Sequence, residues 1–91
     1  MMSKIPIQID KESNEDINKQ VLRVGLIAEL DAINLYEQLA AITTDEKIKK
    51  VLYDIANEEK THIGEFQALL LKYDKEQEGE LKKGSEEVEE I

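Results

Sequence analysis

The sequence predicts an all-α protein built on an antiparallel two-helix hairpin, and three observations lead to this fold class. Two long segments lack proline and carry apolar residues at helical spacing, and the short stretch TTDEK (43–47) connects them. Strand signals are nearly absent: the sequence shows very little alternation of β-branched apolar residues with polar ones. Apolar residues make up 41% and charged residues 36% of the chain, which is typical of a soluble helical protein covered with charge.

The chain is expected to begin with an extended lead-in over residues 1–13, because Pro6 keeps the residue before it out of helical geometry. The first helix is predicted over 14–42, a segment with no proline and a single glycine. Ser13 is the expected N-cap, and two acidic residues follow in the first turn, where the helix dipole favours negative charge.

The second helix is predicted over about 45–73. Thr43, with Glu46 three residues later, matches the capping-box pattern at a helix start. A connection as short as TTDEK makes the two helices antiparallel neighbours. A hairpin of this size has only a thin core of its own.

The last part of the chain is rich in acidic residues and contains two glycines. We expect a short third helix over 76–83 and then a flexible tail. The chain therefore divides into the lead-in (1–13), the helical hairpin (14–75), and the short helix with its acidic tail (76–91).

Charge and composition exclude several functional classes. The net charge of −9 argues against a nucleic-acid partner and is compatible with gathering cations, although solubility alone also explains it. The chain has no cysteine, which excludes disulfides, thiol catalysis and iron–sulfur clusters and fits a reducing, cytoplasmic location. No apolar run approaches the roughly 18 residues of a membrane span, and no signal-peptide core is present.

Glu29, Glu59 and His62 stand out because helical periodicity places each of them on an apolar face. At about 100° per residue, the face centred on Glu29 collects Leu22, Gly25, Leu26, Ala32, Ile33, Tyr36 and Ala40. The face centred on Glu59 collects His62, the only histidine of the chain, with Ile48, Leu52, Ile55, Ala56, Ile63, Phe66, Leu70 and Tyr73. Burying an ionised carboxylate is costly unless it is compensated, and no lysine or arginine shares either face. A bound cation is the simplest compensation, although a neutral, hydrogen-bonded pair of Glu59 and His62 in the core is an alternative.

The ligand count favours a site shared by two chains. Carboxylate-bridged di-iron sites in helical bundles use a Glu from each of two helices and a Glu-x-x-His unit from each of two others. This chain carries half of that set. The hairpin also leaves one long face bare, including Leu22, Leu26, Leu52 and Phe66. A twofold homodimer would supply the missing ligands and complete a four-helix bundle.

The segment AELDAINLYEQLA (28–40), followed by EEKTHIGEF (58–66), resembles the encapsulated ferritins, which are ferritin-like proteins linked to encapsulin nanocompartments. The similarity covers roughly residues 14–75. It implies a ferritin-like hairpin that dimerises around a di-iron ferroxidase centre, with Glu29, Glu59 and His62 from two chains binding the iron. It also implies that Tyr36 lies beside this centre.

The resemblance further implies that dimers associate into an open decameric ring. Such a ring has no closed storage cavity, so the surrounding encapsulin shell holds the ferric mineral. The expected location is therefore the interior of a cytoplasmic nanocompartment. The resemblance also implies an accessory metal-entry site near the dimer axis, at positions 28 and 31 of this chain.

The chain departs from the family pattern in three places. Asp31 keeps an acid of the possible entry site, but Ala28 does not, so we expect that site to be weakened or moved. Leu35 stands where the family has a tryptophan. The C-terminal segment KKGSEEVEEI (82–91) does not resemble the shell-targeting peptide of free-standing members, so we expect either a truncation or a domain naturally joined to the shell protein.

Two other functions remain open from the sequence. A rubrerythrin-like di-iron peroxidase or oxidase is disfavoured, because that family generally carries two Glu-x-x-His units in one chain and a cysteine-rich module. A non-catalytic helical oligomerisation module that binds divalent metal is the other alternative. For Tyr36, an ordinary core aromatic is as good an interpretation as a redox role.

Overall fold

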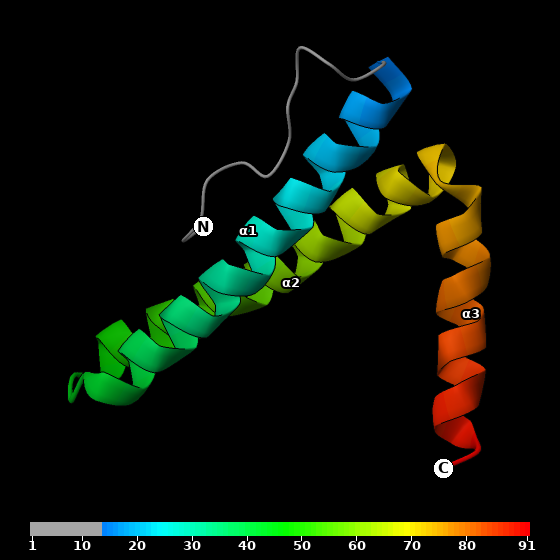
Figure 1. Ribbon diagram of the computed structural model, residues 1–91. Helices are drawn as coiled ribbons and strands as arrows, with labels where there is room; N and C mark the ends of the chain where they lie inside the picture. Colours follow the sequence, from blue (N-terminus) through cyan, green and yellow to red (C-terminus); the bar gives the residue numbers. More distant parts are fainter. Residues whose placement is uncertain (1–13) are drawn as a thin grey trace.

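The computed structural model describes residues 14–91, which form three helices: α1 (Asn14–Ile42), α2 (Glu46–Tyr73) and α3 (Lys75–Glu89). The predicted all-α class and the two-helix hairpin are confirmed. α1 and α2 run antiparallel, side by side, and α3 turns away from the end of α2 (Figure 1). The predicted lead-in over 1–13, with Pro6 and the N-cap at Ser13, lies outside the described residues.

The start of α2 differs from the predicted capping box. The N-cap is Asp45, whose Oδ1 accepts hydrogen bonds from the backbone N–H groups of Lys47 at 2.9 Å and Ile48 at 3.0 Å. Thr43 accepts a bond from the Asp45 backbone instead, at 3.2 Å. One carboxylate thus accepts hydrogen bonds from two N–H groups that have no partner within the helix. It also places a negative charge at the positive end of the helix dipole, whereas a threonine hydroxyl carries no charge.

The prediction for α3 was wrong beyond residue 83, because the helix continues to Glu89 where a flexible tail was expected. A glycine inside a helix costs only about 1 kcal/mol relative to alanine, so Gly79 and Gly84 do not end it. Acidic residues in its first turn complement the helix dipole. No residue of α3 is buried.

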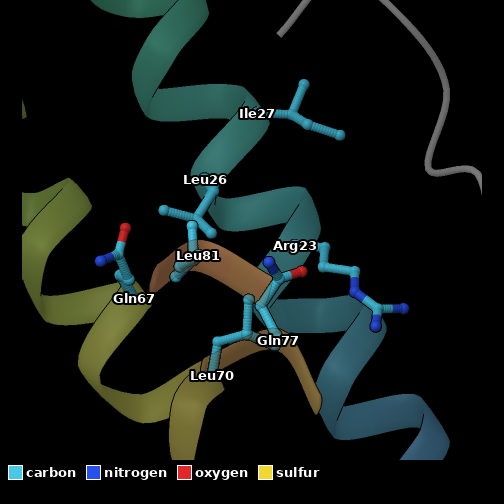
Figure 2. A pocket seen from close by; sticks show the side chains of 7 residues that line it. All are labelled: Arg23, Leu26, Ile27, Gln67, Leu70, Gln77 and Leu81. Atoms are coloured by element: carbon cyan, nitrogen blue, oxygen red, sulfur yellow. The ribbon is translucent and has the colours of Figure 1, made fainter. Parts of the chain in front are cut away.

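α3 meets the hairpin around a small apolar cavity of about 320 Å³. Leu26 and Ile27 of α1, Leu70 of α2 and Leu81 of α3 contribute to its lining (Figure 2). Few other contacts join α3 to the hairpin. Its direction is therefore set mainly at its first turn.

Asp74 fixes that first turn. One carboxylate oxygen, Oδ1, accepts a hydrogen bond from the backbone N–H of Gln77 at 3.0 Å, and the other, Oδ2, accepts one from the Arg23 guanidinium at 2.8 Å. These contacts hold the pKa of Asp74 below its ordinary value, the Gln77 backbone bond first and the Arg23 side chain second. One carboxylate thus caps α3 and ties it to α1.

We expect the start of α3 to loosen in acid. A depressed pKa in the folded state means that the Asp74 carboxylate stabilises the fold above the pKa of the unfolded chain. This stabilisation is lost as the pH falls through the folded-state pKa, below the ordinary carboxyl range. The protection of the Gln77 amide, which is its exchange rate compared with that of an unstructured amide at the same pH, should fall several-fold across that window. In Asp74→Ala this protection should be low already at neutral pH, whereas Asp54→Ala, an exposed change within α2, should behave as wild type. A wild-type pH profile in Asp74→Ala would contradict this assignment.

The hairpin has a very small core. In the described part of the chain, four apolar residues are buried: Leu22, Ala40, Ala56 and Leu70. All lie along the contact between α1 and α2. The radius of gyration is 16.4 Å, whereas a compact domain of this length would have about 12 Å. None of the described helices is long and apolar enough to cross a membrane.

Large apolar side chains remain exposed on both helices of the hairpin. The prediction of a bare face that includes Leu22, Leu26, Leu52 and Phe66 was wrong. Leu22 is only 9% exposed, and the other three are half-buried. The exposed apolar residues are spread over more than one side of the hairpin. On α1 and α2 they are Val21, Ile27, Leu30, Leu35, Leu39, Ile42, Ile48, Val51, Tyr53, Leu69 and Tyr73.

Candidate metal centre

Glu29, Glu59 and His62 meet near the middle of the hairpin, as their spacing predicts. Glu29 comes from α1, and Glu59 and His62 lie one turn apart on α2. Because the helices are antiparallel and joined by a short connection, the midpoints of α1 and α2 lie level with each other. Each of the three residues offers a ligand atom, and these atoms all lie within 4.8 Å of one another.

The histidine lies between the two carboxylates without satisfying them. His62 Nδ1 is 3.4 Å from Glu29 Oε2 and 3.5 Å from Glu59 Oε2. Charged hydrogen bonds between nitrogen and oxygen are shorter, about 2.7–2.9 Å. The alternative of a hydrogen-bonded Glu59–His62 core pair therefore has little support.

Glu29 carries an unsatisfied buried oxygen. Its Oε2 atom is buried without a hydrogen-bond partner, and its side chain is only 17% exposed. The Glu59 side chain is 18% exposed. Leaving a buried acceptor unpaired costs about 1–3 kcal/mol, and more for a charged group, so such an atom calls for a ligand.

The donor set fits a divalent metal ion. Carboxylate oxygens with one imidazole nitrogen suit iron and related first-row metals. A cation between the two glutamates would neutralise their mutual repulsion and satisfy Glu29 Oε2. Nδ1 is the imidazole nitrogen that faces both carboxylates, so it is the atom placed to bind.

Tyr36 and Asp31 are not part of this three-residue cluster. Tyr36 is half-buried on α1, two turns beyond Glu29, as the periodicity predicts. Asp31 is also half-buried and takes part in an interaction of its own. The roles of a residue beside the centre and of a possible entry site stay predictions.

One side of the site is open and bordered by bare apolar residues. The His62 side chain is 44% exposed, far more than either glutamate. Ile48, Ile55, His62 and Leu69 follow one another at seven-residue intervals, so they form one line along α2. Ile48, Ile55 and His62 were already expected on one face of α2, and the seven-residue interval adds Leu69 to them.

The apolar residues beside His62 belong to one face of the hairpin. Val51 and Leu69 lie about 80° to one side of Glu59, and Leu35 and Leu39 lie about 80–120° to the corresponding side of Glu29. Because the two helices are antiparallel, these sides form a single surface. We call this surface the open flank: Leu35 and Leu39 of α1, with Val51, His62 and Leu69 of α2. All four apolar members are more than 40% exposed.

Comparison with known proteins supports a single family. The EncFtn-like family matches residues 6–89. The crystal structure of an encapsulated ferritin domain from Pyrococcus furiosus is similar, with a TM-score of 0.87 and 52% sequence identity, over 100% of this chain and 95% of that one.

Two full-length relatives are also similar. The ferritin-like–encapsulin shell fusion protein of Pyrococcus furiosus is 54% identical over 85 residues, which is 93% of this chain but 25% of that protein. The encapsulin nanocompartment cargo protein EncC of Myxococcus xanthus is 37% identical over 65 residues, covering 71% of this chain and 50% of that protein. The chain thus spans half or less of these relatives.

Proposed function

Because the chain belongs to the EncFtn-like family of encapsulated ferritin domains, we propose that it is a ferroxidase. It would oxidise Fe(II) to Fe(III) with dioxygen at a di-iron centre shared by two copies of the chain. Iron is the substrate of this reaction, which serves iron mineralisation and storage. Members of this family are generally ferroxidases, which supports the same activity here.

The observation that carries the proposal is the half-complete metal site. Glu29, Glu59 and His62 gather their ligand atoms within 4.8 Å, yet Glu29 Oε2 has no hydrogen-bond partner. Two copies would supply four glutamates and two histidines, which is the ligand set of carboxylate-bridged di-iron bundles. The exposed side of His62 is the side from which a second copy would approach.

The open flank supports a dimer of this kind. A twofold interface uses the same surface on both copies, so it would cover Leu35, Leu39, Val51 and Leu69 while it joins the two half-sites. The pair would form a ferritin-like four-helix bundle. Other bare residues lie on the opposite side of the hairpin, including Ile27 and Leu30, and leave surface for association into an open decameric ring.

Each protein residue has a defined task in this mechanism. Bound iron would supply the redox chemistry: two Fe(II) ions would each give one electron to dioxygen, which with two protons from solvent would yield two Fe(III) ions and one hydrogen peroxide. Glu29 and Glu59 hold the ions close together, and hard carboxylate oxygens stabilise Fe(III) more than Fe(II). His62 would bind through Nδ1, the ring nitrogen that lies close to both carboxylates. Tyr36 is proposed to lie beside the centre on the Glu29 face of α1.

The partner of the domain is proposed to be an encapsulin shell. One relative is a shell fusion protein and another is a nanocompartment cargo protein, so this domain would act either as cargo or as part of a fused chain. The site would then lie inside a cytoplasmic nanocompartment, which receives the ferric product. The net charge of −9 suits a surface that gathers cations.

The test is stopped-flow absorbance after the metal-free protein is mixed with Fe(II) in aerated buffer. We expect ferric absorbance to rise much faster than in buffer alone and to saturate near one iron per chain. If Fe(II) were oxidised no faster than in buffer, the result would favour the alternative of a non-catalytic module that only binds metal. Rapid consumption of hydrogen peroxide with an external reductant, without Fe(II) oxidation by dioxygen, would favour a peroxidase instead.

A further inference from the structure

Gly25 of α1 touches the aromatic ring of Phe66 of α2 so closely that no side chain fits between them. A Cβ at position 25 would lie 2.7 Å from Cε1 of the ring and 2.9 Å from both Cδ1 and Cζ. Ordinary contacts between carbon atoms are about 3.5–4.0 Å. Three atoms of one ring are involved, so the ring packs directly on the backbone of α1.

This contact is adjacent to the metal-binding cluster on both helices. Gly25 is four residues before Glu29, and Phe66 is four residues after His62. Residues four apart on a helix are neighbours on the same face. The contact between Gly25 and Phe66 therefore lies one helical turn from the metal-binding cluster on both helices. How closely the Phe66 ring packs on Gly25 affects the distance between α1 and α2 at Glu29, Glu59 and His62.

We infer that Gly25 is a positioning residue of the metal site, an inference that rests on the proposed function. It touches no ligand atom. By lacking a side chain it lets Phe66 pack against α1, and this packing sets the separation at which Glu29 meets Glu59 and His62.

A single added methyl group should disturb this separation. To restore an ordinary contact, the ring or the helix would have to move by roughly 0.8 Å. The ring is rigid, and its first side-chain torsion has few allowed values in a helix. Metal–ligand distances tolerate only about ±0.2 Å. A movement of that size would pull Glu29 out of range of an ion held by Glu59 and His62.

The test is Co²⁺ binding, followed by the visible absorption of the bound ion. We expect Gly25→Ala to bind Co²⁺ about 10- to 100-fold more weakly than wild type, the range seen when residues that orient metal ligands are changed. Its helical content should be unchanged or slightly higher, because alanine favours helix over glycine. The matched control is Gly64→Ala, two residues from His62, where an added Cβ meets nothing within 4 Å.

Rescue separates positioning from a general structural defect. Gly25→Ala combined with Phe66→Leu removes the clash, so its affinity should return to within a few-fold of that of Phe66→Leu alone. Wild-type affinity in Gly25→Ala, loss of helical structure in that variant, or failure of the rescue would each overturn the inference. If wild-type protein binds no Co²⁺, the proposed metal site itself fails, which is a different outcome.

Discussion

Replacing Glu29 with alanine is expected to lower the rate of Fe(II) oxidation more than about 100-fold, close to the rate in buffer. Changing a residue that merely orients a metal ligand costs about 10- to 100-fold, and Glu29 is proposed to be a ligand itself. A dimer of this variant would lose two carboxylates, one from each half-site. His62→Ala should have a similar effect. Stopped-flow absorbance and iron titration of the metal-free protein measure the rate and the affinity.

The matched control is Glu37→Ala, which removes the same charge from the same helix. Glu37 is 46% exposed and lies 3.9 Å from Lys60, an arrangement that contributes little to stability. Its loss should leave Fe(II) oxidation unchanged. Both variants should keep the helical content of wild type. If Glu29→Ala oxidised iron at the wild-type rate, Glu29 would not be a ligand, and the shared centre would have to be abandoned.

A charge on the open flank is expected to break the dimer and, with it, the activity. Leu69 is 46% exposed in the hairpin, so Leu69→Glu should fold normally as a single chain. In the proposed dimer, both copies would bury the new carboxylate without a partner. This costs several kcal/mol, and every 1.4 kcal/mol is tenfold in the dissociation constant. We expect association to weaken at least about 100-fold, as measured by analytical ultracentrifugation with and without Fe(II).

Ala68→Glu provides the control for this experiment. Ala68 is exposed and lies about 100° around α2 from Leu69, directly opposite Glu59, so its charge would point to the side of the dimer interface and not into it. It should remain dimeric and active. A Leu69→Glu protein that dimerised and oxidised iron like wild type would show that the open flank is not the shared interface. The same conclusion would follow if wild-type chain stayed monomeric at micromolar concentration with iron present.

The fold could be predicted where local rules act alone. The bounds of α1 were predicted as they are observed, because one long proline-free segment ends at a polar connection. The end of α3 was not predicted correctly, because Gly84 was expected to end the helix. A glycine inside a helix lowers its stability only modestly, and α3 continues to Glu89. The start of α2 was placed within about one residue, but its cap was assigned to Thr43, whereas Asp45 accepts the hydrogen bonds of the first-turn N–H groups.

The cluster of three residues at the candidate site was predictable from the sequence, but the packing beside it was not. Glu29, Glu59 and His62 were found because periodicity placed polar groups on apolar faces, and the structure brings them together. The contact of Gly25 with Phe66 was not found. A glycine on an apolar face has no signature of its own, and only coordinates show what lies above it.

The small core has a consequence for when the protein becomes active. With four buried apolar side chains among the described residues, and with only half of the proposed shared site, a newly synthesised chain would be catalytically silent. In the proposed mechanism two chains would have to meet before iron is oxidised, so the onset of activity would scale with the square of the subunit concentration at low occupancy. Dilute chains in transit would then leave the cellular iron pool untouched, and oxidation would begin only where an enclosure crowds them together.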